Sequence, residues 1–499
     1  MEIGILGMHD DDEEEVIVYD PNALIFIGVT GITDSVSKNA INNLVKDLKA
    51  INAVQANFVN FDNPASSKLR FFYPLVGGTA DSQKWNLIDP RDLDAAFRIA
   101  WANDHAANHT VNGYKPNGID QCGDTKCVPS VSLTEDDTHL AIYPTDDVAE
   151  TIYDLGAVTA SGNFGLASRG ADNLTYNVQY DGSHGSLPPS FSSIGFFIGT
   201  RTDNSILTTF RDGGKTGYDN TADVKTRPDV SVWLGGMNYT TPLYASKNYG
   251  CASGGAGITD AAAVLYDAAV YKAMLALGRV SARPTVKLRA GVCVSVDDQV
   301  FNTAGVIKVT QMKSGWGFIG TIYQLGEPTA QQIIDGTSLI ALGWEIGTHE
   351  NIQTYRLTHT PAETWTNLIA LSHNEVIAHL GVTPVSFANH IDGATVDVDL
   401  LAELETNHGY VNIRLIDQGA HDVYYDGSSQ IYRGFYCDAL AFADIKPYVD
   451  DALANDKILI MFFHYSTTRM NVMETVVAYV KYLNMSCYTA HELIPALFA

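Results

Sequence analysis

The pattern of apolar residues changes once along this chain, near residue 281. Before that point, short β-branched and aromatic runs such as 194–198 and 206–210 alternate with clusters of Gly, Asn, Asp and Ser. Many short strands separated by turn residues are typical of a β-sandwich. After that point, strand-like runs alternate with helix-like runs, which predicts a parallel sheet or a β/α barrel. A chain of 499 residues is too long for one ordinary hydrophobic core. We therefore predict a multidomain protein, with a β-sandwich followed by an α/β domain.

Three segments follow from this pattern. We predict an acidic N-terminal attachment segment over 1–23, a sandwich over 24–280 and an α/β domain over 281–499, with Ser-Ala-Arg-Pro at 281–284 as the linker. Helices are expected in the sandwich half at 40–50 and at 261–277, the second between an N-cap at Thr259 and a stop at Gly278. In the C-terminal half we expect strands at 292–296, 384–388, 410–416 and 458–463, and helices at 328–342, 361–380, 444–454 and 472–483, the last capped by Asn471.

The formal charge of −26 limits the partners of the chain. A surface this acidic argues against nucleic acid, whose phosphates need a basic face, and against docking on an anionic membrane. No apolar run reaches the roughly 20 residues that span a bilayer. The start lacks a basic region and carries six consecutive acids at 10–15, so we predict no signal peptide. Neutral or acetylated sugars stay compatible with such a surface.

The six cysteines are spread thinly. Cys122 and Cys127 flank four residues, a spacing that could close a small disulfide loop. There is no paired C-x-x-C set, so the sequence argues against a structural zinc cluster. We expect most of the cysteines to be ordinary small buried residues.

Polar residues follow the apolar strand runs of the C-terminal half. The residues at those four strand ends are Asp297 with Asp298, His349, Asn389 with His390, and His464. In a β/α barrel the C-terminal strand ends converge on one face, where loops build the active site. Four strand ends that carry such residues therefore favour a single active-site pocket, either a working one or a vestigial one.

The structural alternative applies to each residue taken alone. An Asp pair after a strand also caps turn amides, and a lone His at a strand end is more often structural than a ligand. We assign this structural role to four other histidines, His373, His379, His408 and His421.

Several runs of the N-terminal half carry a family resemblance. They are Thr-Gly-Ile-Thr-Asp at 30–34, Phe-Tyr-Pro-Leu-Val-Gly-Gly-Thr at 72–79, Asn-Leu-Ile-Asp-Pro-Arg-Asp-Leu-Asp-Ala-Ala-Phe-Arg at 86–98, Gly-Thr-Arg-Thr at 199–202 and Gly-Ile-Thr-Asp at 257–260. With them, residues 24–280 resemble the concanavalin A-like (laminin G-type) jelly-roll sandwich of bacterial surface and phage tail or fibre proteins. The resemblance implies glycan binding or a structural module. No E-x-D-x-E run provides the paired carboxylates of a glucanase.

The order of polar residues over 284–499 resembles the polysaccharide deacetylases of carbohydrate esterase family four. The resemblance implies a distorted β/α barrel in which Asp297 is the general base and Asp298 binds the metal. His349, after Glu-Ile-Gly, and Gln353 fall where the family has two metal histidines four residues apart. His464 falls where the family has its proton donor.

The chemistry accounts for these residue types. Zinc or a similar divalent ion takes imidazole and carboxylate ligands, activates water and polarises a carbonyl. An unligated Asp can accept the proton of that water, and a His can protonate the leaving group. The implied activity is metal-dependent removal of N- or O-acetyl groups from a polysaccharide.

The sequence departs from the family at two places. Gln353 replaces a metal histidine, and an amide oxygen binds zinc more weakly than imidazole does, unless His359 or His390 substitutes for it. The run Phe-Ala-Asn-His-Ile-Asp-Gly at 387–393 lacks the usual proline of the third motif, where Asn389 and His390 are the candidate substrate-binding residues. A working deacetylase and a degenerate domain kept for binding or assembly both stay open.

Three functional hypotheses result. The first is a glycan-binding virion or surface protein of the phage tail or fibre type, which binds surface polysaccharide or peptidoglycan and deacetylates it. The second is a purely structural or adhesion component of a virion. The third is a bacterial secreted carbohydrate esterase whose leader is missing. Other virion proteins are candidate partners of the acidic segment, and homo-oligomerisation stays open because no heptad repeat specifies it.

Overall fold

The computed structural model describes most of the chain. The described residues are 17–160, 162–180, 190–203, 205–219, 226–281, 291–297, 306, 308–310, 312–313, 318–325, 329–350, 358, 360–392, 398–417, 424–425, 431–464, 466–483 and 485–490. The acidic run, most of the predicted linker, Asp298, Gln353, His359 and His421 lie outside them.

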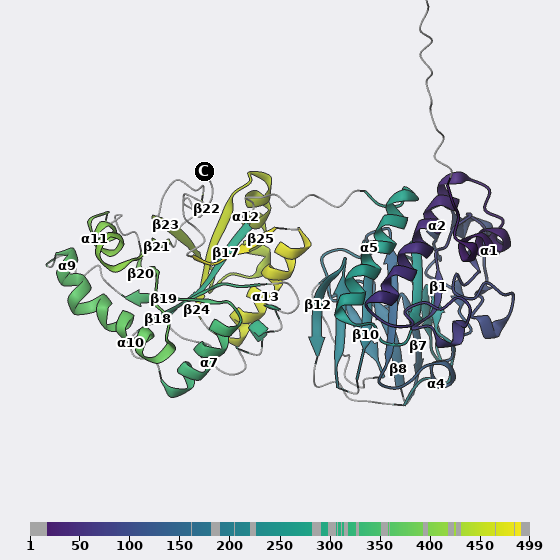
Figure 1. Ribbon diagram of the computed structural model, residues 1–499, viewed down its shortest axis with the longest axis horizontal. Helices are drawn as coiled ribbons and strands as arrows, with labels where there is room; N and C mark the ends of the chain where they lie inside the picture. The colour runs from purple at the N-terminus through teal and green to yellow at the C-terminus, as the bar shows by residue number, and fades with distance from the viewer. Residues whose placement is uncertain are drawn as a thin grey trace, which may run out of the picture.

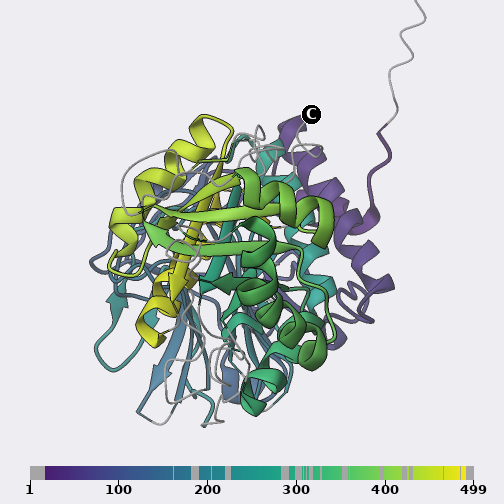
Figure 2. The ribbon, with the colours of Figure 1, turned by 90° about the vertical axis from the view of Figure 1, so that its left-hand side faces the viewer.

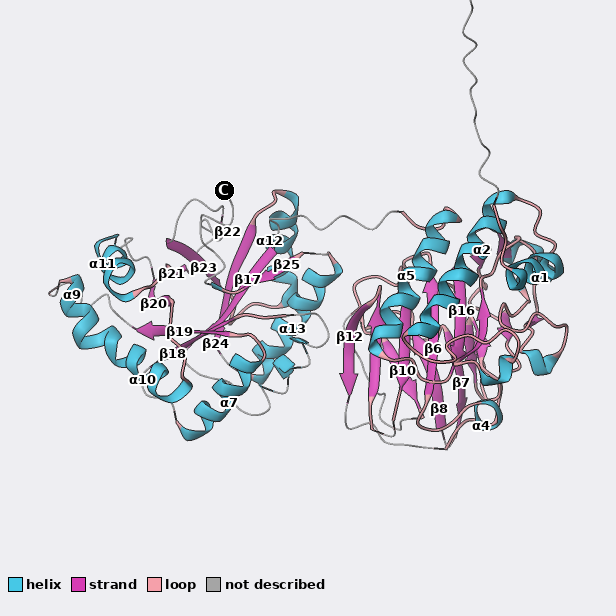
Figure 3. Ribbon diagram, viewed as in Figure 1, coloured by secondary structure: helices cyan, strands magenta, loops and turns pink. Residues whose placement is uncertain are grey.

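The N-terminal half contains two sheets (Figures 1 and 3). The first has the order β12 (Gly214–Asp219), β11 (Leu207–Arg211), β10 (Phe197–Arg201), β6 (Thr138–Pro144), β16 (Tyr249–Gly255), β4 (Gly113–Tyr114) and β3 (His109–Thr110), with β1 (Leu69–Tyr73) also on β16. The second has the order β15 (Leu243–Tyr244), β14 (Gly236–Asn238), β7 (Leu155–Thr159), β13 (Trp233–Leu234), β5 (Cys122–Asp124) and β2 (Ala100–Ala102), with β8 (Gly162–Ala167) paired with β7 and β9 (Tyr176–Gln179) paired with β8. Every printed pair is antiparallel except β14–β7.

One apolar core lies between the two sheets. It joins Leu140 and Ile142 of β6 to Leu155 of β7 and Phe164 of β8, all fully buried. Short strands with turn residues between them produce this layered arrangement because each strand buries one face. Its classification as a concanavalin A-like jelly roll stays a prediction.

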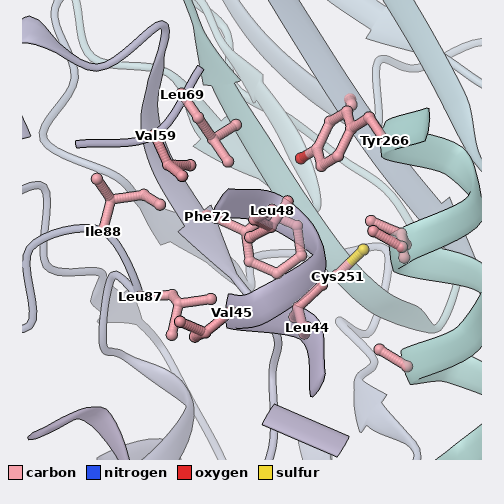
Figure 4. Packing of buried hydrophobic residues seen from close by; sticks show 14 of the residues in the cluster. Leu44, Val45, Leu48, Val59, Leu69, Phe72, Leu87, Ile88, Cys251 and Tyr266 are labelled. Atoms are coloured by element: carbon pink, nitrogen blue, oxygen red, sulfur yellow. The ribbon is translucent and has the colours of Figure 1, made fainter. Parts of the chain in front are cut away.

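Helices cover the other face of the first sheet. They are α1 (Pro21–Thr30), α2 (Ser35–Ala50) and α5 (Asp260–Ala276), and short helices α3 (Ala80–Gln83) and α4 (Pro129–Ser132) lie in loops. Figure 4 shows Leu44 and Leu48 of α2 packed with Phe72 of β1 and Tyr266 of α5. The N-cap at Thr259 and the stop at Gly278 are confirmed, since Thr259 accepts from the Ala262 amide and Gly278 has φ +68°.

The structure corrects one local prediction and decides one open point. The helix expected at 40–50 starts earlier, at Ser35, because the Asp34 carboxylate accepts from the Ser37 amide and caps it there. The loop disulfide that the spacing allowed does not form, and Cys122 and Cys127 are free, buried thiols, as expected for most of the cysteines. Burial raises the pKa of each thiol to about 12, so both behave as small apolar residues.

The C-terminal half is a barrel of parallel strands (Figure 2). In its described part the order is β17 (Gly291–Asp297), β18 (Thr321–Leu325), β19 (Glu345–Glu350), β20 (Ser386–Asp392), β21 (Asn412–Asp417), β23 (Ile431–Tyr436) and β24 (Ile458–His464). Pairing of β24 with β17 closes the barrel. The short strands β25 (Ser486–Tyr488) and β22 (Tyr424–Tyr425) add to β17 and β24.

The helices around the barrel are α7 (Ala330–Ala341), α9 (Pro361–Thr364), α10 (Ala370–Leu380), α11 (Val398–His408), α12 (Phe442–Ala454) and α13 (Thr467–Tyr482). A π-helical turn, Trp365–Ile369, joins α9 to α10. The predicted cap Asn471 is wrong, because α13 begins earlier, where Ser466 accepts from the Arg469 amide. Among the described residues, no helix has both the length and the apolar character needed to cross a bilayer.

One aromatic residue of the N-terminal half packs against the barrel helices. The ring of Phe191 lies 5.1 Å from that of Phe442 on α12 and 4.9 Å from that of Tyr479 on α13. Beside it, the Arg211 guanidinium stands 4.7 Å from the Tyr482 ring centroid. Because these rings exclude water from one another, Phe191 fixes a contact between the two halves.

We predict that Phe191→Ala loosens this contact. Removing the half-buried ring should cost about 2 kcal/mol at the contact, less than a fully buried Phe. Small-angle X-ray scattering should then show a larger radius of gyration than in the wild type. Ile119→Ala, which trims an exposed apolar residue of the same half, is the control and should not change the scattering. Identical scattering curves for Phe191→Ala and the wild type would contradict the prediction.

Candidate active site

The ladder that closes the barrel brings two predicted site residues together. Asp297, the last residue of β17, is the register partner of His464, the last residue of β24. Residues paired in a parallel ladder point to the same face of a sheet. On the other side of β17, Asp297 is paired with Tyr323 of β18. The predicted base and the predicted proton donor are therefore neighbours at the C-terminal end of the barrel.

Asp297 is fully buried and forms an ion pair across the barrel. Its Oδ2 lies 2.5 Å from Nη2 of Arg414 on β21. Arg414 also donates from Nη1 to the Ser295 hydroxyl, two residues before Asp297 on the same face. Within the described residues, Oδ1 of Asp297 has no hydrogen-bond partner. The pair thus fixes one carboxylate oxygen and leaves the other to accept a proton.

Aromatic rings surround the Arg414 guanidinium. Its central carbon lies 4.9 Å from the ring centroid of Tyr323 and 4.4 Å from that of Phe462 on β24. A delocalised cation is well suited to such ring faces, and its charge is balanced by Asp297. The two buried charges are therefore held in one geometry by residues of four strands, β17, β18, β21 and β24.

His464 is oriented by a second carboxylate. Its Nδ1 lies 2.7 Å from Oδ2 of Asp438, and its backbone amide donates to Oδ1 at 2.8 Å. Arg469, on the first turn of α13, places Nη1 2.8 Å from the same Oδ2. Because Nδ1 is engaged by Asp438, proton exchange with a substrate falls to Nε2.

Asp438 remains ionised under ordinary conditions. Burial acts to raise the pKa of its carboxyl, but the hydrogen bonds from His464 and the positive charge of Arg469 outweigh it, so the pKa lies below its usual value. An ionised carboxylate at Nδ1 stabilises the imidazolium form of His464. The arrangement therefore suits a His that takes up and gives back a proton.

The predicted metal ligands are only partly described. His349 is fully buried near the end of β19, in register with Ala388 of β20. A buried imidazole at a strand end is a donor that zinc accepts. The described residues contain no group of three His, Cys, Asp or Glu side chains close enough to hold a metal ion. Asp298 and Gln353 lie outside the described residues, so their ligation of a metal stays a prediction.

The predicted substrate residues Asn389 and His390 lie in β20. Their backbone is at the C-terminal end of the barrel, where Asn389 is the register partner of Glu350, and their side chains are outside the described part of the structure. Their role in substrate binding stays a prediction.

Three other histidines have structural surroundings. His408 stacks on Trp365 with ring centroids 3.6 Å apart, and His373 contacts the Tyr410 hydroxyl at 2.9 Å. His379 pairs with Glu375 on the surface of α10. These contacts agree with the structural role expected for them.

Sequence reasoning missed two residues of the site, Arg414 and Asp438. Arg414 lies inside the run 410–416, which we interpreted only as a strand, although a charged residue within an apolar strand is itself a signal. Asp438 follows β23, a strand that the sequence analysis did not predict. Its position two residues past a strand end is the same signal that identified Asp297 and His464.

We predict that Arg414→Met destabilises the barrel by about 3–5 kcal/mol, because Asp297 would be left buried without its counter-charge. The double variant Arg414→Met with Asp297→Leu should recover most of this loss. Urea unfolding measures both. Lys446→Met removes an exposed ion pair with Asp450 and should cost less than about 1 kcal/mol. A double variant as unstable as Arg414→Met would show that charge burial is not the cause.

No protein-family model and no curated protein sequence matches the chain. Similar solved structures include a family 4 carbohydrate esterase (CE4) domain of a multidomain xylanase from the hindgut metagenome of Trinervitermes trinervoides, with 12% identity, 41% of this chain and 89% of that chain covered, and a TM-score of 0.29. A family 4 carbohydrate esterase from Streptomyces lividans has 12% identity, coverage of 40% and 91%, and a TM-score of 0.28. A family 4 acetyl xylan esterase from Clostridium thermocellum, in complex with a cobalt ion, has 14% identity, coverage of 43% and 97%, and a TM-score of 0.28.

Proposed function

We propose that the C-terminal barrel is a metal-dependent deacetylase of an N- or O-acetylated polysaccharide, either surface polysaccharide or peptidoglycan. The observation that carries the proposal is the placement of Asp297 opposite His464 in the closing ladder, each held by its own ion pair. Hydrolysis of an acetyl group needs a base and an acid at one carbonyl, and these two side chains provide them.

Asp297 is assigned as the general base. Arg414 holds Oδ2, so the carboxylate cannot rotate away, and Oδ1 is the atom that accepts the proton of the attacking water. Burial in the barrel keeps bulk water from competing for this oxygen.

His464 is assigned as the general acid. Asp438 fixes the ring and stabilises its protonated form, and Nε2 donates the proton to the leaving amine or hydroxyl of the sugar. The hydrogen bonds from His464 and the charge of Arg469, which shares the Asp438 carboxylate, hold the pKa of Asp438 below its usual value. Base and acid thus act from adjacent strands on one substrate.

A divalent metal, with zinc the best fit, would be held by Asp298, His349 and Gln353. When bound, such an ion polarises the acetyl carbonyl and activates the water. Asn389 and His390 would position the sugar from β20. The resemblance of residues 24–280 supports placing the whole chain on a virion of the phage tail or fibre type, or on an extracellular surface, with the sandwich binding glycan.

A second candidate is a structural or adhesion protein without catalysis. The observation that favours it is Gln353, a neutral amide at the position where a second imidazole would bind the metal. The third hypothesis, a secreted bacterial esterase, shares the chemistry of the first and differs only in its location.

Metal content and acetate release test the proposal together. We expect about one zinc or similar ion per chain, and acetate release from acetylated chito-oligosaccharides or peptidoglycan. Asp298→Ala should lose both. Asp297→Asn should keep the metal and lower the rate by about 10²–10⁴-fold, the usual contribution of a general base. His379→Gln, on the surface of α10, should change neither. No metal and no acetate in the wild type would favour the second candidate.

Asp438→Asn tests the orientation of His464. We expect the variant to keep the metal and to lower acetate release about 100-fold, since the imidazolium loses its stabilising charge. The drop should be in kcat rather than in KM, because Asp438 lies behind His464. A change confined to KM would instead assign Asp438 to substrate binding.

A further inference from the structure

A buried lysine and a buried aspartate meet in the N-terminal half, and we propose that they form an intramolecular isopeptide bond, from Nζ of Lys247 to Cγ of Asp154. Lys247 lies two residues before β16 of the first sheet, and Asp154 directly precedes β7 of the second sheet. The bond therefore joins the two sheets of the sandwich covalently. This modification is independent of the chemistry proposed for the barrel.

The two reacting groups are in contact and out of water. Nζ of Lys247 lies 2.9 Å from Oδ1 of Asp154, and both side chains are 0% exposed. The Asp154 backbone is also fixed, because its amide donates to the Leu166 carbonyl and its carbonyl accepts from the Gly235 amide. An amine held against one carboxyl has a high effective concentration, which removes much of the entropic barrier to amide formation.

Three hydrogen-bond donors polarise the Asp154 carboxyl. The Ser168 amide and hydroxyl donate to Oδ2 at 2.6 and 2.7 Å, and the Tyr249 hydroxyl donates to Oδ1 at 2.8 Å. Donors fixed on a carboxyl oxygen stabilise the negative charge that develops there when an amine adds to the carbon. Oδ2 is therefore suited to become the amide oxygen, and Oδ1, beside Nζ, is suited to leave.

A second carboxyl, that of Glu150, stands beside the pair. Its Oε1 lies 3.6 Å from Nζ of Lys247, and the Ser246 amide and hydroxyl donate to its Oε2 at 3.1 and 3.0 Å. Burial raises the pKa of the Glu150 carboxyl, and the negative charge of Asp154 adds to the rise against the opposing charge of Lys247. One carboxylate is enough to balance one ammonium. The second carboxyl is explained by proton transfer, since a carboxyl with a raised pKa both accepts and donates a proton readily.

The reaction is a condensation. A proton moves from Nζ to Oδ1 of Asp154, because two full charges are disfavoured out of water. The neutral Nζ of Lys247 then attacks Cγ, the Cγ–Oδ1 bond breaks, and Glu150 carries a second proton from Nζ to the leaving oxygen. The products are one amide and one water molecule. No electron is transferred, so the step needs no oxidant and no co-reactant, and the buried setting protects the amide from hydrolysis.

Intact mass spectrometry of the full-length protein tests the bond. The wild type should be lighter by one water molecule than its sequence requires. Lys247→Arg keeps the positive charge but has no amine that can lose its proton, so it should have its full sequence mass. Glu150→Gln should lose the water about 10²-fold more slowly after refolding, because the proton carrier is missing. Lys115→Arg is the matched control, since Lys115 pairs with Asp146 at 2.8 Å on the surface, and it should lose the water as the wild type does.

Digestion followed by mass spectrometry locates the loss of water. A branched peptide that joins the segments around Asp154 and Lys247 supports the proposal. A folded wild type with its full sequence mass overturns it, and leaves these residues as a buried ion-pair cluster. A loss located instead at an Asp-Gly sequence such as 212–213, which can form a cyclic imide without Lys247, overturns it as well. The wild-type mass decides the question by itself, so a variant that fails to fold does not obscure the result.

Discussion

The seven-residue ladder between β17 and β24 is the constraint on which the candidate site depends. It closes the barrel and pairs the first strand of the C-terminal half with its last long one, since Gly291 pairs with Ile458 and Asp297 with His464. The same register that closes the barrel sets Asp297 opposite His464. Because side chains alternate along a strand, a slip of one residue would turn one of the two away from the other. The apolar residues before them, from 292 to 296 and from 458 to 463, fix the register, so the core and the site are specified by the same pattern.

The ion pair of Asp297 and Arg414 is costly for the fold. Two charges taken out of water recover their desolvation only with good geometry, and apolar replacements of buried ion pairs are often as stable or more so. Here the geometry is good, with a bond to Asp297, a second bond to Ser295 and two aromatic faces around the guanidinium. If packing were the only requirement, leucine or methionine would be sufficient at the two positions. A carboxylate held in one orientation at the end of a strand is more simply explained by chemistry at that end.

Some features of the fold and of the candidate site could be predicted from the sequence, and others could not. The alternation of strands and helices predicted a barrel-like C-terminal half, and the polar residues after strands predicted that Asp297 and His464 would meet. Local capping was less predictable: Asn471 has the right chemistry for a cap, but Ser466 starts the helix earlier because its hydroxyl meets the Arg469 amide. Arg414 was missed because its partner lies on a strand more than 100 residues away, and only the closed barrel brings the two together.

The candidate site has two parts, one proposed to transfer protons and one proposed to hold the metal. The groups proposed to move protons, Asp297 and His464, end β17 and β24, and each has a partner that fixes its orientation. The residues that would hold the metal, Asp298, His349 and Gln353, follow β17 or come from β19 and the residues after it, and Gln353 differs from the imidazole found there in the family that the sequence resembles. A site without function would not need a buried carboxylate beside a buried guanidinium, because such a pair lowers the stability of the fold and would serve no other purpose. The buried Asp297–Arg414 pair therefore favours the proposed chemistry, and the proposed activity depends on whether the Gln353 amide oxygen can complete a metal site with Asp298 and His349.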